Sequence, residues 1–273
     1  MTGIAISRRA DRRVGPDDML KAAAALCFAT VAAGMWIFTT YLAAYYGSIV
    51  LRHGWAGLYD TYMPKGFIPG DGVGNALVGA HILAAITAMG AGPLQLVPWI
   101  RARAPAVHRW TGRVFITAAV VGALGGVYLT WARPKGHLIQ AFNISLNAVL
   151  ILAFATLALR FAMQRKIAIH RRWALRLLLV VNGPLFLRIA YTLWYWFANL
   201  TGVTFERLFD VLTIAQYVVP LAILELYLRA KDRGGAAGRY AAAGGLLAVS
   251  VLTGFGVYLA TTGMWLPRAT SMG

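Results

Sequence analysis

Seven apolar stretches, each long enough to cross a lipid bilayer, constrain this chain more than any other feature of its sequence. A spanning helix needs about 20 predominantly apolar residues. The stretches that meet this requirement lie at residues 22–49, 76–100, 110–131, 138–159, 173–199, 208–228 and 240–262. The connections between them are short and leave no room for a soluble domain. The sequence therefore predicts one all-α polytopic membrane domain over residues 1–273, with seven transmembrane helices.

Composition supports this class and excludes a nucleic-acid-binding protein. Hydrophobic residues make up 59% of the 273 residues, and charged residues only 13%. The net charge of +17 comes from Lys and Arg side chains that cluster between the apolar runs, as juxtamembrane charges do. Membrane lipids are therefore the expected partners.

The distribution of Lys and Arg predicts the orientation of the chain. Nineteen of them lie in the N-terminal segment and in the connections at 101–113, 160–176 and 229–239, against six near the opposite helix ends. Cytoplasmic connections carry the excess of these residues. We therefore expect a cytoplasmic N-terminus and an outer C-terminus.

Two similar basic and aromatic motifs open the third and fifth predicted helices, both on the cytoplasmic side. The first contains His108, Arg109, Trp110 and Arg113, and the second contains His170, Arg171, Arg172, Trp173 and Arg176. The N-terminus of a helix attracts anions, and arginine binds carboxylate or phosphate in a fork. The two motifs together predict an anion or cofactor site at one membrane face.

The motifs also suggest an internal repeat. Helices two and three form one hairpin, and helices four and five form another. When His108 is aligned with His170, His81 of helix two matches Asn143 of helix four. This predicts a four-helix core from helices two to five, built from two parallel repeats.

Polar residues inside the predicted spans are candidates for function. His81 lies in apolar surroundings on helix two, and Gln95, fourteen residues later, is expected on the same helix face. Arg188 lies inside helix five, where a central arginine costs at least about 2.5 kcal/mol and needs a partner. We expect Asp210 to be that partner.

A second predicted ion pair joins Arg176 to Glu225 at the cytoplasmic end of helix six. The longest outer connection, at 52–74, is expected either to cover the outer end of the bundle as a lid or to serve only as a connector.

These residues resemble a bacterial family of multi-pass membrane proteins that is described only as having a domain of unknown function. The similarity covers about residues 76 to 190 and rests on His81, Gln95, Arg188 and the two motifs. It implies a membrane protein of about this size and brings no reaction with it. We expect the protein to lie in the bacterial inner membrane. A looser similarity, of architecture alone, is to cytochrome b561-like and ferric-reductase-like haem bundles.

Two functions remain open at this point. In the first, the protein is a membrane redox or electron-transfer component that binds haem b or a quinone between the two motifs. His108 and His170 would then hold the haem iron or flank the quinone, Arg113 and Arg176 would meet propionates, and His81 would mark an outer site.

In the second, the protein binds or transports an anionic amphiphile, such as a lipid or isoprenoid phosphate, on the paired helix N-termini. The sequence holds no nucleophile and base constellation of a hydrolase or transferase. Whether the chain is an oxidoreductase component, and whether it has a redox partner or forms a homo-oligomer, stays open.

Overall fold

The computed structural model describes residues 15–61, 63, 65–133, 137–202 and 204–270, and this part of the chain contains helices and no strands. The α-helices are α1 (Pro16–His53), α2 (Gly72–Ala91), α3 (Pro98–Arg103), α4 (Pro105–Ala132), α5 (Leu138–Met163), α6 (Ile167–Val181), α7 (Gly183–Thr201), α8 (Phe205–Arg233), α9 (Ala236–Ala260) and α10 (Leu266–Thr270). Short helical turns are η1 (Trp55–Asp60), η2 (Pro93–Leu96) and η3 (Thr261–Trp265).

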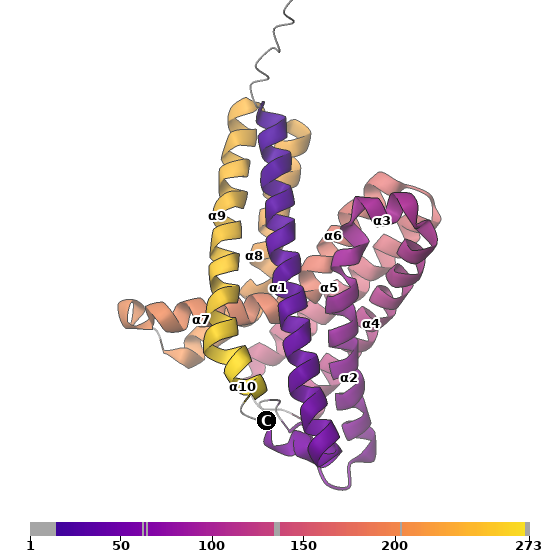
Figure 1. The fold of residues 1–273 in the computed structure, drawn as a ribbon, viewed down its shortest axis with the longest axis vertical. Helices are drawn as coiled ribbons and strands as arrows, with labels where there is room; N and C mark the ends of the chain where they lie inside the picture. The colour runs from indigo at the N-terminus through magenta and orange to yellow at the C-terminus, as the bar shows by residue number, and fades with distance from the viewer. Residues whose placement is uncertain (1–14, 62, 64, 134–136, 203, 271–273) are drawn as a thin grey trace, which may run out of the picture.

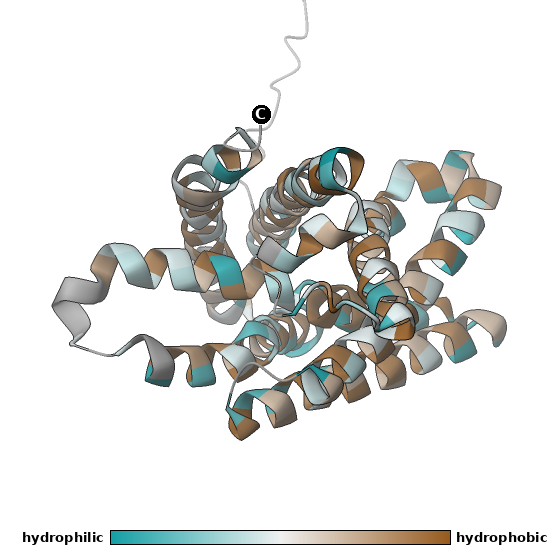
Figure 2. Cartoon of the chain, turned by 90° about the horizontal axis from the view of Figure 1, so that it is seen from below, coloured by the Kyte–Doolittle hydropathy of each residue, from teal (hydrophilic) through white to brown (hydrophobic). Residues whose placement is uncertain are grey.

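Six helices of the described chain are long and apolar enough to cross a membrane, and the bent pair α6 and α7 makes a seventh span if it is counted as one. The chain is therefore an all-α polytopic membrane protein, as predicted. Figure 2 shows hydrophobic residues around much of the circumference of the long helices. Exposed apolar side chains of this kind, such as Leu124, Val149 and Val251, are suited to contact with lipid tails.

The helices fall into two groups that share a core. In Figure 1, α1, α8 and α9 run side by side, and α2 to α6 form the rest of the bundle. One cluster of buried apolar residues joins the groups, with Met35 from α1, Met89 from α2, Phe115 from α4, Tyr217 from α8 and Trp265 from η3. The core thus extends beyond the predicted helices two to five.

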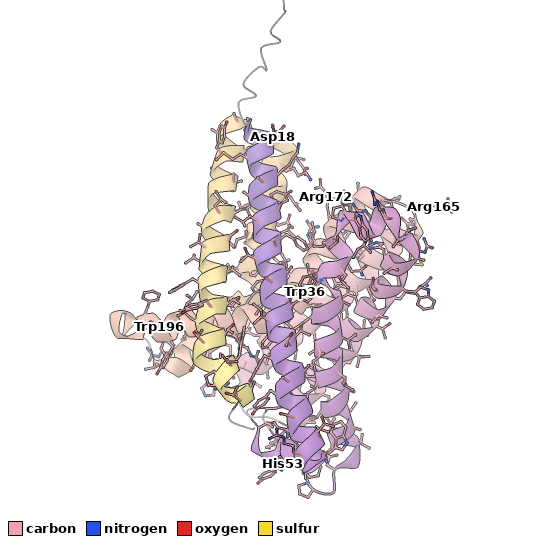
Figure 3. All side chains as sticks on the ribbon, viewed as in Figure 1. Asp18, Trp36, His53, Arg165, Arg172 and Trp196 are labelled. Carbon is pink, nitrogen blue, oxygen red and sulfur yellow. The ribbon has the colours of Figure 1, made fainter. Side chains whose placement is uncertain are left out.

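The predicted orientation supplies names for the two ends of the bundle. Figure 3 shows Asp18, Arg165 and Arg172 toward one end of the bundle and His53 at the other. We call the end that holds His53 the outer end and the opposite end the cytoplasmic end.

The stretch predicted as one helix at 76–100 is divided, and one prediction that depended on it is wrong. The helix α2 ends at Ala91, Pro93 begins the turn η2, and Pro98 begins α3. Because proline cannot donate a backbone hydrogen bond, both prolines interrupt the helical ladder. Gln95 lies in η2, so it does not share a helix face with His81.

The stretch predicted as one helix at 173–199 is also divided, with a bend of 51° between α6 and α7. Pro184 lacks the N–H group that would bond to the carbonyl oxygen of Val180. Asn147 of α5 supplies the missing donor, since its Nδ2 lies 3.2 Å from that oxygen. A side chain from a neighbouring helix therefore stabilises the break.

The bend turns α7 sideways out of the bundle. Figures 1 and 3 show α7 crossing the direction of α1 and α9, with Trp196 far from the bundle axis. Tyr195 and Trp196 are exposed there. Aromatic residues of this kind are enriched where a membrane protein meets the interface between lipid and water.

Candidate functional site

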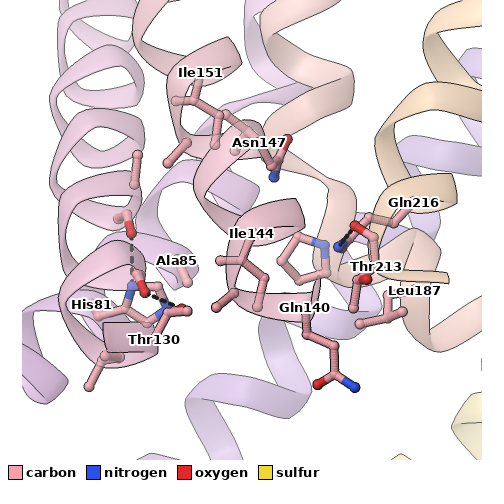
Figure 4. A pocket seen from close by; sticks show the side chains of 18 of the residues that line it. His81, Ala85, Thr130, Gln140, Ile144, Asn147, Ile151, Leu187, Thr213 and Gln216 are labelled. Atoms are coloured by element: carbon pink, nitrogen blue, oxygen red, sulfur yellow. Dashed lines mark hydrogen bonds between the residues drawn. The ribbon is translucent and has the colours of Figure 1, made fainter. Parts of the chain in front are cut away.

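A cavity of about 640 Å³ lies in the outer half of the bundle, between α2, α4, α5, α7 and α8. Alanine, glycine and other apolar residues form most of its wall. The polar residues that line it are His81, Thr130, Arg133, His137, Gln140, Asn147, Arg188, Thr213 and Gln216. Figure 4 shows His81 and Thr130 on one side and Thr213 and Gln216 on the other. A small organic molecule fits a volume of this size.

His81 is held in one orientation by α4. Its Nδ1 lies 2.9 Å from the carbonyl oxygen of Gly122. Because a carbonyl only accepts, Nδ1 carries the proton and Nε2 is left as an acceptor. Gly125 allows the close approach, since a Cβ there would lie 3.1 Å from the His81 Cβ. The glycines of α4 thus make room for the histidine that lines the cavity.

The break between α6 and α7 forms another part of the wall. Besides its contact with Val180, Asn147 has a buried Oδ1 atom with no hydrogen-bond partner. Gln216 of α8 donates from Nε2 to the carbonyl oxygen of Thr213 at 2.8 Å. A Cβ on Gly183 would lie 3.0 Å from Gln216 Oε1 and 3.4 Å from Asn147 Nδ2. These side chains therefore meet at the break with little free space.

Arg188 lines the cavity from α7, and its predicted partner is wrong. Its Nη1 donates to the carbonyl oxygen of Pro184 at 2.9 Å, and its guanidinium lies 4.8 Å from the centre of the Phe38 ring. Asp210 instead accepts from Gln140 Nε2 at 2.8 Å and lies 3.6 Å from His137 Nδ1. The bend before Arg188 separates it from the aspartate that a straight helix predicts as its partner.

An arginine joins the outer connection to the bundle. Arg133 has only 1% of its side chain exposed, and it donates to Asp71 Oδ2 at 2.5 Å, Asn75 Oδ1 at 2.9 Å and the carbonyl oxygen of Lys65 at 2.8 Å. Leu58 of the same connection is buried. Met63 of the connection and Arg133 both line the cavity, so the connection contributes to its wall. We call Arg133 and its three acceptors the outer latch.

The outer latch makes stability depend on pH. The hydrogen bond from Arg133, followed by that from the Gly74 N–H, holds the pKa of Asp71 below its ordinary value. A lowered pKa gives stability that is fully present above the unfolded value of about 3.9 and is lost as the pH falls through the folded value. We expect the difference in unfolding temperature between the wild type and Asp71→Asn to shrink below about pH 4. A difference that is constant from pH 7 to the acid limit of folding would contradict this.

The cytoplasmic motifs adopt matching conformations. The Arg113 guanidinium lies 4.9 Å from the centre of the Trp110 ring, and that of Arg176 lies 4.8 Å from the centre of the Trp173 ring. The predicted pair of Arg176 and Glu225 is confirmed, with 2.6 Å between Nη2 and Oε1. The repeated spacing thus gives a repeated cation–π contact.

The motif histidines and Gln95 make local contacts. Nδ1 of His170 lies 2.8 Å from the carbonyl oxygen of Ala158. Gln95 contacts the Thr111 hydroxyl at 2.6 Å, and one amide orientation also bonds it to the His108 carbonyl and the Gly112 N–H. His108 and His170 interact electrostatically, which places the two motifs in the same region of the molecule.

The structure brings only two of the predicted site residues, His81 and Arg188, together around the cavity. The residues that do not line it are Gln95, His108, Arg109, Trp110, Arg113, Asn143, His170, Arg172, Trp173 and Arg176. Asn143 bonds the Thr213 hydroxyl at 2.9 Å, and Arg172 bonds Asp232. Among the residues that the structure describes, no three His, Cys, Asp or Glu side chains form a metal site.

Sequence reasoning missed Arg133 as a lining residue and missed the break between α6 and α7, where Val181 and Pro184 line the cavity. In the sequence, Arg133 is only one of the six Lys and Arg residues near the predicted outer helix ends. The succession of Asn182, Gly183 and Pro184 inside an apolar run was the available signal, because it predicts a break in the helix.

Comparison with known proteins identifies a family. No curated protein and no solved structure matches the chain, so the similarity to cytochrome b561-like bundles is not supported. A family model described as "Predicted membrane protein (DUF2306)" matches residues 78–228. The match covers more than half of the chain and contains His81, Arg188 and both motifs. The chain therefore belongs to this family of predicted membrane proteins.

Proposed function

We propose that the protein is a redox component of the bacterial inner membrane that binds a quinone-class ligand in the outer cavity. The observation that carries this proposal is a cavity of about 640 Å³ whose apolar wall bears His81 on α2 and Arg188 on α7. A ligand site of this kind is typically apolar with a few placed polar groups.

The polar groups complement a ring that carries oxygen atoms. Arg188 is a donor and suits a quinone carbonyl, whereas His81 Nε2 and the unpartnered Asn147 Oδ1 are acceptors and suit the hydroxyl groups of a quinol. The apolar wall suits the ring itself. Quinones supply two-electron redox chemistry when bound, and the residues of this chain would orient them and exclude water.

Replacement of His81 by Leu tests the proposal. Loss of one hydrogen bond to the ligand costs about 1.4 kcal/mol, or about a tenfold loss of affinity. We therefore expect solvent extracts of purified His81→Leu protein to contain less quinone than wild-type extracts, by up to about tenfold where the site is far from saturated. His53→Leu is the matched control, because His53 is exposed at the outer end and does not line the cavity. Wild-type protein without any quinone, or equal contents in all three proteins, would overturn the proposal.

Haem b fits the cytoplasmic motifs less well. Arg176, which was expected to meet a propionate, is held by Glu225. His108 and His170 do not line the cavity. The haem prediction has a direct test in the absorption spectrum of oxidised and dithionite-reduced protein, where a Soret band would favour haem.

The anionic amphiphile at the cytoplasmic helix N-termini also stays a prediction. Glu225 already neutralises Arg176, which leaves Arg113 as the motif arginine more available to a phosphate. Replacing both arginines by Gln tests this alternative through the amount of lipid that co-purifies.

A further inference from the structure

Arg188 differs from Arg133 and Arg176, two other arginines whose side chains are little exposed. Arg133 forms an ion pair with Asp71, and Arg176 forms one with Glu225. Arg188 has no carboxylate partner among the residues that the structure describes. Its contacts are one carbonyl oxygen, that of Pro184, and the face of the Phe38 ring.

The other charged or titratable groups near Arg188 do not neutralise it. Tyr41 and Tyr46 are phenols, which are neutral at pH 7, and Arg268 adds a second positive charge. A guanidinium has five N–H donors, and the carbonyl of Pro184 takes only one of its nitrogens. Burying a charge without a counter-charge is unfavourable, so a compensating anion is expected close by.

The cavity is where such an anion can lie. Arg188 is only half-buried although it packs against α1, and it lines the cavity. Its unused donors therefore have access to a bound molecule. Arginine binds charged oxygens more strongly than neutral ones, because the Coulomb attraction between opposite charges adds to the hydrogen bond.

We propose that the cavity selects ligands with a negatively charged oxygen attached to an aromatic or quinone ring, such as a hydroxyquinone anion or a deprotonated quinol. Arg188 is the counter-charge. This rests on the proposed function and adds the charge state of the ligand. Arg188 is a specificity-determining residue in this view, and His81 and Asn147 help to position the ring.

Two probes of similar shape test the inference. The first is 2-hydroxy-1,4-naphthoquinone, whose hydroxyl group is ionised at neutral pH, and the second is uncharged 1,4-naphthoquinone. Titration of the purified full-length protein, followed by tryptophan fluorescence, gives a Kd for each. We expect the wild type to bind the anion at least tenfold more tightly than the neutral probe.

Variants at Arg188 separate charge from shape. Arg188→Gln keeps a hydrogen-bond donor without the charge and should bring the ratio of the two Kd values close to one. Arg188→Lys keeps the charge and should retain most of the preference. Equal Kd values in the wild type would overturn the inference even if neither variant folds, and so would an unchanged ratio in Arg188→Gln. If neither probe binds the wild type, the proposed function fails as well.

Discussion

Arg133→Met is expected to lower the free energy of unfolding by about 3 kcal/mol, because it removes one partner of a buried ion pair. Methionine fills a similar space but donates no hydrogen bond. Asp71, Asn75 and the carbonyl oxygen of Lys65 would each lose the donor that the outer latch supplies. Thermal unfolding in detergent, followed by circular dichroism at 222 nm as is usual for helices, measures the effect.

Two further variants define the cause. Arg133→Lys keeps the charge but not the planar fork, so it should recover only part of the loss, since three acceptors surround the guanidinium. Arg207→Met is the matched control, because Arg207 is exposed near the same end, and its effect should stay within about 0.5 kcal/mol. If Arg133→Met and Arg207→Met unfold at the same temperature, the outer latch does not stabilise the fold.

Limited proteolysis of Arg133→Met is an independent test of the outer latch. Buried Leu58 and the contacts of Lys65 and Asp71 tie the outer connection to the bundle. Without Arg133, cleavage within the connection should become faster while the spanning helices stay protected, because opening would be local. Cleavage at the wild-type rate would show that the other contacts of the connection are sufficient.

Features that depend on local spacing were predictable from the sequence. Apolar length gave the spans, since a bilayer imposes a minimum length on a helix. The three-residue spacing of Trp110 and Arg113, and of Trp173 and Arg176, places each guanidinium beside its indole, because such residues are neighbours on a helix surface. The pair of Arg176 and Glu225 could be predicted because Arg176 comes before the break that ends α6, so its depth does not depend on the bend.

Features that depend on where helices end were not predictable in the same way. The prediction that Arg188 pairs with Asp210 assumed one straight helix, in which residue number gives the depth of Arg188 in the membrane. The 51° bend at the break makes that assumption wrong. Gln95 was placed on the face of His81 by the same assumption, although α2 ends at Ala91. The cavity needs five helices, so no local pattern encodes it.

The break between α6 and α7 gives the last prediction, in which Gly183→Val both destabilises the protein and removes the ligand. A Cβ on Gly183 would lie 3.0 Å from Gln216 Oε1 and 3.4 Å from Asn147 Nδ2, and valine adds two further methyl groups. Gly183 directly precedes Pro184 at the start of α7, where a side chain with a branched Cβ also crowds the proline ring, so valine acts through the backbone as well as through packing. Overpacking of this kind costs about 2 kcal/mol.

The displaced side chains explain why binding should fail together with stability. Asn147 and Gln216 line the cavity, and Asn147 also supplies the donor for the Val180 carbonyl left free by Pro184. We expect Gly183→Val protein to unfold at a lower temperature and to yield quinone-free extracts. Gly245→Val is the matched control, since Gly245 is exposed on α9 with no atom within 4 Å of its Cβ position. Wild-type quinone content in folded Gly183→Val protein would place the ligand outside this cavity, because the substitution alters its wall directly.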